Sequence, residues 1–248
     1  MRDEIELNSN AGNFPVYVSA PDGEVKGGLV VIHEVWGLTD HIKSVADRFA
    51  REGYLVIAPN LLAEIDIPDE LSGELQNGLF NPDPKIRNDV QPKLRELMTP
   101  IHAPQFSLNT ITKLKTSFDY LMNKPETKQK IGVVGYCFGG TYSFTSAINE
   151  PRLKAAVPFY GHNDSSVEEL KKITCPILAF YGENDEGLIG SLPDLRDRMK
   201  AAKVKFDYKI YQNCGHAFFN DTNRYSYNSE AATDAWRLTL EFLSNNLA

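Results

Sequence analysis

Cysteine is scarce in this sequence, and so are long apolar runs. Three cysteines occur among 248 residues, without a CxxC spacing, so the sequence suggests neither a disulfide framework nor a cysteine-based zinc site. No apolar run approaches the roughly 18 residues that would indicate a membrane span. The first residues, Met1 to Glu6, are acidic and polar and lack the basic and apolar regions of a secretory signal. We therefore expect a cytoplasmic protein with reduced cysteines and no membrane contact.

Basic residues are fewer than acidic residues in this sequence. Lys and Arg together number 26 against 33 Asp and Glu, which gives a formal net charge of −7. A general nucleic-acid binder needs a basic face to neutralise phosphates, so this balance argues against that class of protein. The histidines other than His216 show no metal-ligand spacing. We therefore expect neither a nucleic-acid partner nor a bound metal.

Short runs rich in β-branched residues alternate with longer stretches of helical period. Expected strands cover residues 15–20, 29–33, 54–58, 131–135, 155–160, 176–181 and 206–211, and expected helices cover 40–52, 108–121, 141–149, 165–172, 192–203 and 229–246. The run Leu29–His33 is apolar up to its last residue, as expected for a strand buried on both faces. The alternation is typical of an α/β fold, a mostly parallel sheet with helices on both faces.

The stretch from Glu64 to Ser107, which we call the covering segment, differs from the rest of the chain. It holds six prolines and many charged residues. It is too long for a plain connection, so we expect short helices that lie over one end of the sheet and over the site. No linker, internal repeat or low-complexity tract divides the chain. We therefore expect residues 1–248 to form a single α/β domain.

The strongest chemical signal is Gly135-Tyr136-Cys137-Phe138-Gly139-Gly140, which comes directly after an expected strand and directly before an expected helix. In a G-x-nucleophile-x-G elbow, the nucleophile occupies a sharp, strained strand-to-helix turn, and the glycines allow neighbouring backbones to approach. The helix N-terminus also favours the reactive thiolate. The alternative is a glycine-rich turn with a buried, inert cysteine.

Two further residues favour the catalytic interpretation. Asp185 follows the strand at 176–181, where an α/β-hydrolase places its acid, and His216 follows the strand at 206–211, where it places its base. The chain order is nucleophile, acid, histidine, which is the order of this fold. We expect His216 to take the proton of the Cys137 thiol and Asp185 to orient the imidazole.

An oxyanion hole needs two N–H donors. The N–H of Phe138, directly after the nucleophile, is one candidate, and the N–H of Val35, in the loop after the strand at 29–33, is the other. Glu34 lies in the same loop, and a carboxylate at the end of a buried strand needs a partner. It either contacts the thiol or a substrate group, or forms a salt bridge with an arginine.

Other residues give weaker signals. Tyr160 ends a strand and either lines the pocket or belongs to the core. Cys175 and Cys214 flank strands and are expected to be small core residues. The basic side chains of the covering segment are expected to be solvated, although one could meet an anionic substrate; they are Lys85, Arg87, Lys93 and Arg95.

With these residues in place, the sequence resembles the dienelactone hydrolase family (carboxymethylenebutenolidases) over nearly its whole length. The matching pieces are His33 to Leu38, Gly53 to Pro59, Gly135 to Gly140, Tyr160-Gly161, Asp185 and Gly215 to Phe218. A cysteine in the elbow together with a glutamate after the early strand is a fairly specific mark of this family.

The resemblance implies an α/β-hydrolase fold without cofactor or metal, and a small-molecule ester or enol-lactone substrate opened through an acyl-cysteine intermediate. It also implies that Glu34 helps to set the protonation and position of Cys137. Glu34, Trp36 and Tyr160 are accordingly expected to bind the substrate or to tune the thiol. A monomer or a small homo-oligomer is expected.

The chain departs from the family at one point. Family members that act on dienelactone hold its carboxylate with arginines, one of them shortly after the catalytic histidine. Here Asn220 and Asp221 follow His216-Ala217-Phe218-Phe219, and no arginine occurs before Arg224. Asparagine cannot replace the bidentate, charge-assisted contact of arginine with a carboxylate. The sequence therefore predicts a hydrolase without identifying its substrate.

Other functions of the same residues stay open at this point. A thioesterase, acyl transferase or peptidase would use the same three residues. A binding module of the same fold would need a pocket but not an intact set of nucleophile, acid and base. A redox-sensing thiol is a weaker alternative, because no resolving cysteine lies near Cys137 in sequence.

Overall fold

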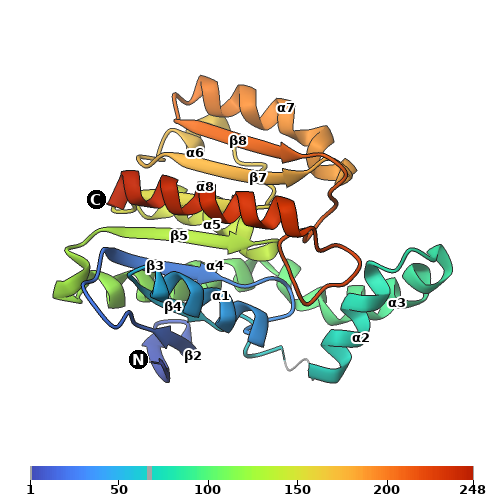
Figure 1. Ribbon diagram of the computed structural model, residues 1–248, viewed down its shortest axis with the longest axis horizontal. Helices are drawn as coiled ribbons and strands as arrows, with labels where there is room; N and C mark the ends of the chain where they lie inside the picture. The colour runs from blue at the N-terminus through green and yellow to red at the C-terminus, as the bar shows by residue number, and fades with distance from the viewer. Residues whose placement is uncertain (1, 66–68, 248) are drawn as a thin grey trace.

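The computed structural model describes residues 2–65 and 69–247. At its centre is an eight-stranded sheet in the order β1-β2-β4-β3-β5-β6-β7-β8 (Figure 1). The strands are β1 (Arg2–Ser9), β2 (Gly12–Ser19), β3 (Gly27–Ile32), β4 (Tyr54–Pro59), β5 (Ile131–Tyr136), β6 (Ala155–Phe159), β7 (Ile177–Gly182) and β8 (Phe206–Tyr211). β1 and β2 pair antiparallel, as do β2 and β4, and all other neighbours run parallel. The parallel strands therefore share one carboxyl edge, where ligands bind in open α/β sheets.

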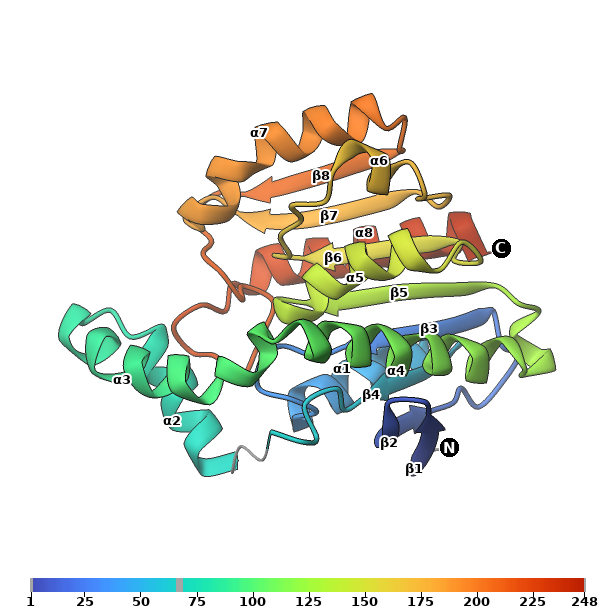
Figure 2. The ribbon, with the colours of Figure 1, turned by 180° about the vertical axis from the view of Figure 1, so that it is seen from behind.

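Helices cover both faces of the sheet, which confirms the predicted α/β fold. α1 (Asp40–Arg51) and α8 (Ser229–Leu247) lie on one face, and α4 (Pro104–Met122), α5 (Phe138–Asn149), α6 (Val167–Leu170) and α7 (Glu186–Ala201) lie on the other (Figures 1 and 2). Phe49 and Leu243 belong to the core on the first face, and Phe118, Phe144 and Met199 to the core on the second. Of the helices in the described ranges, none is long and apolar enough to cross a membrane.

The predicted short helices of the covering segment are present. α2 (Asp69–Leu79) and α3 (Pro84–Leu97), which we call the covering helices, project beyond the carboxyl edge and are followed by the 3₁₀ turn η1 (Thr99–His102) (Figures 1 and 2). Residues 66–68 of the covering segment lie outside the described residues. Trp36, from the loop after β3, packs with Leu75 of α2 and Val90 of α3 in a small apolar cluster. The covering helices are thus attached to the loop that is expected to supply an oxyanion donor.

Several elements differ from the sequence-based expectations. β1 was not predicted, because it is an exposed edge strand in which acidic residues alternate with the partly buried Ile5 and Leu7. α7 begins at Glu186 instead of residue 192, because its two early glycines and Pro193 weaken the helical pattern. α6 is shorter than the expected 165–172, and α5 begins at Phe138 instead of Thr141. A second 3₁₀ turn, η2 (Pro125–Thr127), precedes β5.

Candidate active site

Cys137 occupies a strained turn between β5 and α5. Its backbone has φ 56° and ψ −111°, a conformation that non-glycine residues seldom adopt. The Cys137 N–H donates to the carbonyl of Phe159 at 3.0 Å, and the Gly139 N–H donates to the carbonyl of His33 at 3.0 Å. These bonds tie the turn to the strands on both sides of β5. The thiol is thereby raised at the carboxyl edge of the sheet, as the elbow motif predicts.

The glycines of the elbow are required by close backbone contacts. A Cβ on Gly135 would lie 2.0 Å from the carbonyl oxygen of Gly139, and a Cβ on Gly139 would lie 2.2 Å from that of Ile32. Backbone atoms cannot swing away as a flexible side chain can. The first turn of α5 therefore packs against β5 and β3 only because these positions lack side chains.

The structure brings Cys137, Asp185 and His216 together. Asp185 follows β7, and its Oδ2 lies 2.5 Å from Nδ1 of His216, which follows β8. Cys137 also acts on this imidazole, since it is one of the groups that raise the pKa of His216. The two loops are joined by the Asn184 N–H, which donates to the carbonyl of Cys214 at 2.8 Å. Cys137, Asp185 and His216 thus lie after β5, β7 and β8 at one edge of the sheet, and their roles as nucleophile, acid and base stay a prediction.

The electrostatics of this group favour a charged imidazole. Burial by itself lowers the pKa of His216. The neighbouring Cys137 and Asp185 outweigh burial through charge and hydrogen bonding, and they hold the pKa of His216 well above its usual value. The arrangement therefore favours an imidazolium at His216 next to Cys137.

Glu34 is almost completely buried, at 2% exposure. The Asn220 side-chain amide donates to its Oε2 at 2.6 Å, and the Tyr160 hydroxyl lies 3.5 Å from its Oε1. Burial raises the pKa of Glu34, and these two donors, with the charges of His41 and His216, oppose the increase. The expected alternative of a salt bridge with an arginine is wrong, since none of the arginines in the described ranges pairs with Glu34.

Tyr160 is both a core residue and a site residue. It is 1% exposed, its φ is 37°, and its ring lies 4.9 Å from the His216 ring. Burial raises the pKa of Tyr160, and the neighbouring Glu34 charge raises it further, so the phenol stays neutral. The two interpretations of this residue were therefore not exclusive.

Of the two expected oxyanion donors, Phe138 belongs to the elbow and Val35 to the loop after β3. Phe138 is the first residue of α5, so its N–H has no acceptor within the helix. Val35 lies in a turn closed by the Gly37 N–H, which donates to the carbonyl of Glu34 at 3.3 Å. Trp36 in the same turn is buried under the covering helices.

Sequence reasoning missed three contributors to this site. His33, whose spacing from other histidines indicates no metal site, stacks on Phe138, and its Nε2 accepts the Leu61 N–H at 3.0 Å. Burial lowers the pKa of His33 to about 4, so it is neutral. Asn220 was noted only as a missing arginine, yet it holds Glu34. Phe80, from the turn between α2 and α3, stacks on the His216 ring, with the ring centroids 6.4 Å apart. Asn220 and Phe80 belong to no motif, and the stretch His33 to Leu38 does not reveal the tertiary contacts that His33 makes.

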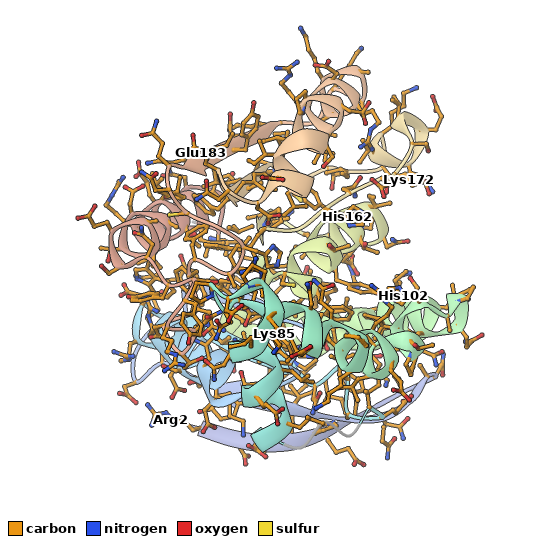
Figure 3. The ribbon with its side chains drawn as sticks, turned by 90° about the vertical axis from the view of Figure 1, so that its right-hand side faces the viewer. Arg2, Lys85, His102, His162, Lys172 and Glu183 are labelled. Carbon is orange, nitrogen blue, oxygen red and sulfur yellow. The ribbon has the colours of Figure 1, made fainter. Side chains whose placement is uncertain are left out.

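Two cavities lie beside these residues. One, of about 690 Å³, includes His216 and Asp185 in its wall, together with Phe80, Arg87 and Tyr225. The other, of about 630 Å³, is lined mainly by apolar side chains such as Leu71, Leu75 and Phe106. Figure 3 views the molecule from the carboxyl edge, with Lys85 and His102 on the covering segment and His162 and Glu183 just beyond the ends of β6 and β7.

The order of strands, the strained turn after β5 and the placement of acid and histidine after β7 and β8 define an α/β-hydrolase fold. The model of the dienelactone hydrolase family matches residues 14–247. The chain belongs to the dienelactone hydrolase family, and it is a hydrolase of that type.

Individual relatives agree with this assignment. A protein of Saccharolobus solfataricus named "Putative carboxymethylenebutenolidase" is 33% identical, with 98% of each chain covered. An Escherichia coli K12 protein of the same name is 28% identical over 95% of this chain and 84% of its own. Among solved structures, a "Putative Dienelactone Hydrolase" from Klebsiella pneumoniae superposes with a TM-score of 0.80 at 25% identity, with 98% of each chain covered.

Proposed function

We propose that this protein hydrolyses an ester or lactone through an acyl-cysteine intermediate on Cys137. The observation that carries the proposal is the pairing of Asp185 with His216 at 2.5 Å, with Cys137 held on a strained turn near enough to raise the pKa of the imidazole. The pKa of His216, which Cys137 and Asp185 hold above its usual value against burial, supports an imidazolium beside the nucleophile at neutral pH.

The geometry supports a two-stage reaction. The Cys137 thiolate attacks the substrate carbonyl carbon, and the developing oxyanion accepts hydrogen bonds from the N–H groups of Phe138 and Val35. His216 then gives its proton to the leaving alkoxide, and the alcohol departs from the acyl-cysteine. In the second stage His216 takes a proton from water, the hydroxide attacks the acyl carbon, and the thiolate is expelled as the acid forms.

Removal of the thiol tests this mechanism. Cys137→Ala should lower kcat/KM for an aryl ester by roughly 10³-fold or more, because no covalent intermediate can form. Cys175→Ala is the matched control, since Cys175 is a buried cysteine that precedes β7, at the opposite edge of the sheet. Intact-mass analysis of the wild type during turnover should show one added acyl group. Full activity in a pure Cys137→Ala preparation would overturn the proposal.

We further propose that the substrate is an ester or lactone without a carboxylate in the position that dienelactone has. The amide of Asn220 is committed to Glu34. Arg87 lines the cavity beside His216, but its Nη1 already donates to the carbonyls of Asn81 and Pro82. Loss of dienelactone absorbance is the measurement, with Cys137→Ala as the blank. Efficient turnover by the wild type would overturn this second proposal and leave the first intact.

A further inference from the structure

One edge of β8, the last strand of the sheet, is unpaired. Within residues 2–65 and 69–247, β8 pairs with β7 alone, and it is the outermost strand in Figures 1 and 2. The Glu183 N–H donates to the carbonyl of Tyr211 at 2.9 Å, so the backbone of Tyr211 is directed at β7. Backbone groups alternate in direction along a strand, so the N–H and C=O groups of Phe206, Tyr208 and Ile210 point away from β7. These three residues can therefore hydrogen-bond to a further strand.

One face of β8 carries aromatic and aliphatic side chains that are only partly covered. Phe206 packs against the core that includes side chains of α7, and the centroid of the Tyr208 ring lies 5.6 Å from that of the Phe206 ring. Ile210 follows on the same face, because side chains two residues apart in a strand point the same way. Tyr208 is 37% exposed and Ile210 is 40% exposed. α7 therefore leaves this row of side chains open to a partner.

The opposite face of β8 carries one acid and one base. Asp207 and Lys209 are both exposed, and the Lys209 ammonium lies 2.5 Å from Oδ2 of Asp234 in α8. An ammonium has three N–H donors, so Lys209 can bind a second carboxylate without releasing the first. An acid and a base two residues apart on one face can pair with the same two residues of an antiparallel strand.

A second β8 would fit this edge in one register. A two-fold axis at Tyr208 places Tyr208 opposite Tyr208 of the second copy and Phe206 opposite Ile210. These residues direct their backbone groups at the partner strand, which allows about six hydrogen bonds across the axis. On the other face Asp207 lies opposite Lys209. A shift by two residues, the smallest that keeps the backbone groups aligned, would place Lys209 opposite Lys209 or Asp207 opposite Asp207. Charge therefore selects the register centred on Tyr208.

The other edge of the sheet lacks this complementarity. β1 exposes three acidic side chains, Asp3, Glu4 and Glu6, along a strand of eight residues. Like charges on neighbouring strands repel, and charged side chains on an edge strand discourage pairing with another chain. Self-pairing is therefore disfavoured at β1 and favoured at β8.

We propose that this protein forms a two-fold symmetric dimer through β8, in which the two sheets join into one continuous sheet centred on Tyr208. The partner is a second copy of this chain, because the apolar row and the charged row of β8 are each complementary to themselves in the register that the backbone requires. The dimer goes beyond the proposed hydrolase function and does not depend on it.

Charge exchange across the axis tests the dimer and its register. Sedimentation analysis of the wild type should give twice the mass of one chain. Asp207→Lys and Lys209→Asp should each weaken the dimer roughly tenfold, because like charges then lie opposite each other at two symmetric places. The double variant Asp207→Lys/Lys209→Asp should restore it, since each acid again faces a base. The control is Lys172→Asp, an equal change of charge at an exposed residue before β7, which should leave the dimer intact (Figure 3).

A disulfide across the axis is a second test. Opposite residues of a hydrogen-bonded antiparallel pair have their Cα atoms about 5.5 Å apart, a distance that a disulfide spans. Tyr208→Cys should therefore cross-link two chains under oxidising conditions, and Lys172→Cys should not.

Three results would overturn the proposal. One is a wild type with the mass of a single chain up to high micromolar concentration, a result that depends on no variant. Another is a dimer that the single charge changes leave unaffected or that the double variant fails to restore. The third is a Tyr208→Cys variant that does not cross-link. None of these results bears on the hydrolase proposal, which depends on Cys137→Ala.

Discussion

The carboxyl edge of the sheet is packed backbone against backbone, whereas the covering helices above it are held by a few side chains. At the elbow, the missing side chain of Gly135 lets β5 pack against the Gly139 carbonyl in the first turn of α5. The missing side chain of Gly139 lets that turn pack against the Ile32 carbonyl of β3. In α3, Val90 is the one buried side chain in the described residues, and most of its neighbours are exposed. The edge therefore tolerates almost no change, and the covering helices can vary. In the proposed reaction the thiol is supplied by the first region, and the second region supplies wall residues of the cavity beside His216 such as Leu79 and Arg87.

Among the variants that test this contrast, Gly135→Ala should cause the largest loss of stability. The added methyl would lie 2.0 Å from the Gly139 carbonyl oxygen, so the strand or the helix must shift, and we expect a loss of about 3 kcal/mol or more in the free energy of unfolding. Urea denaturation measures it. Gly23→Ala is the control, because nothing lies within 4 Å of a Cβ at that position. Equal stabilities of the two variants would show that the elbow is not constrained by backbone contact.

Because of His33, the free energy of unfolding should decrease at acidic pH. It is neutral in the fold because burial lowers its pKa to about 4, whereas an unfolded histidine binds its proton below about 6.5. Between these values the unfolded state binds more protons, so the free energy of unfolding should fall by about 3 kcal/mol as the pH drops through this window.

Urea denaturation from pH 7 to pH 4 would measure that slope. His33→Gln keeps an acceptor for the Leu61 N–H without a titrating ring, so its slope should be shallower. An unchanged slope would mean that other groups cause the acid sensitivity of the edge.

Gly78→Ala should weaken the covering helices while leaving the sheet intact. A Cβ on Gly78 of α2 would lie 2.5 Å from Cγ1 of Val90 in α3. Val90 is β-branched and cannot easily turn aside, so we expect a cost of about 1–3 kcal/mol, confined to the contact between the two helices. Hydrogen exchange should then quicken in α2 and α3 but not in β3 or β5. Faster exchange in the sheet as well would show that the two regions unfold together.

Gly73→Ala should have the smallest effect and the opposite sign. Gly73 also lies in α2, but nothing is within 4 Å of a Cβ there. Alanine favours the helix by about 0.5–1 kcal/mol relative to glycine. Slower hydrogen exchange or proteolysis of the covering helices would record this gain. A loss of stability at Gly73 comparable to that at Gly78 would mean that α2 resists any added side chain.

The local sequence determined the fold class and the three central residues of the site. Buried strands such as β3 and β5 are continuous apolar runs because both of their faces are covered, and the elbow has its glycines because backbones meet there. Cys137, Asp185 and His216 follow strand ends, and parallel topology brings strand ends to one edge. Their placement could therefore be predicted from chain order, without any knowledge of side-chain contacts.

Only the tertiary structure decided how Glu34 is held and what surrounds the histidine. Asn220 and Tyr160 reach Glu34 from loops after β8 and β6, and Phe80 reaches His216 from the turn between the two covering helices. The exposed strand β1 likewise takes its conformation from pairing with β2 and not from an apolar pattern of its own. Such contacts join residues far apart in the chain, and no local periodicity or spacing encodes them, because their energy comes from burial and pairing that exist only after the sheet has formed.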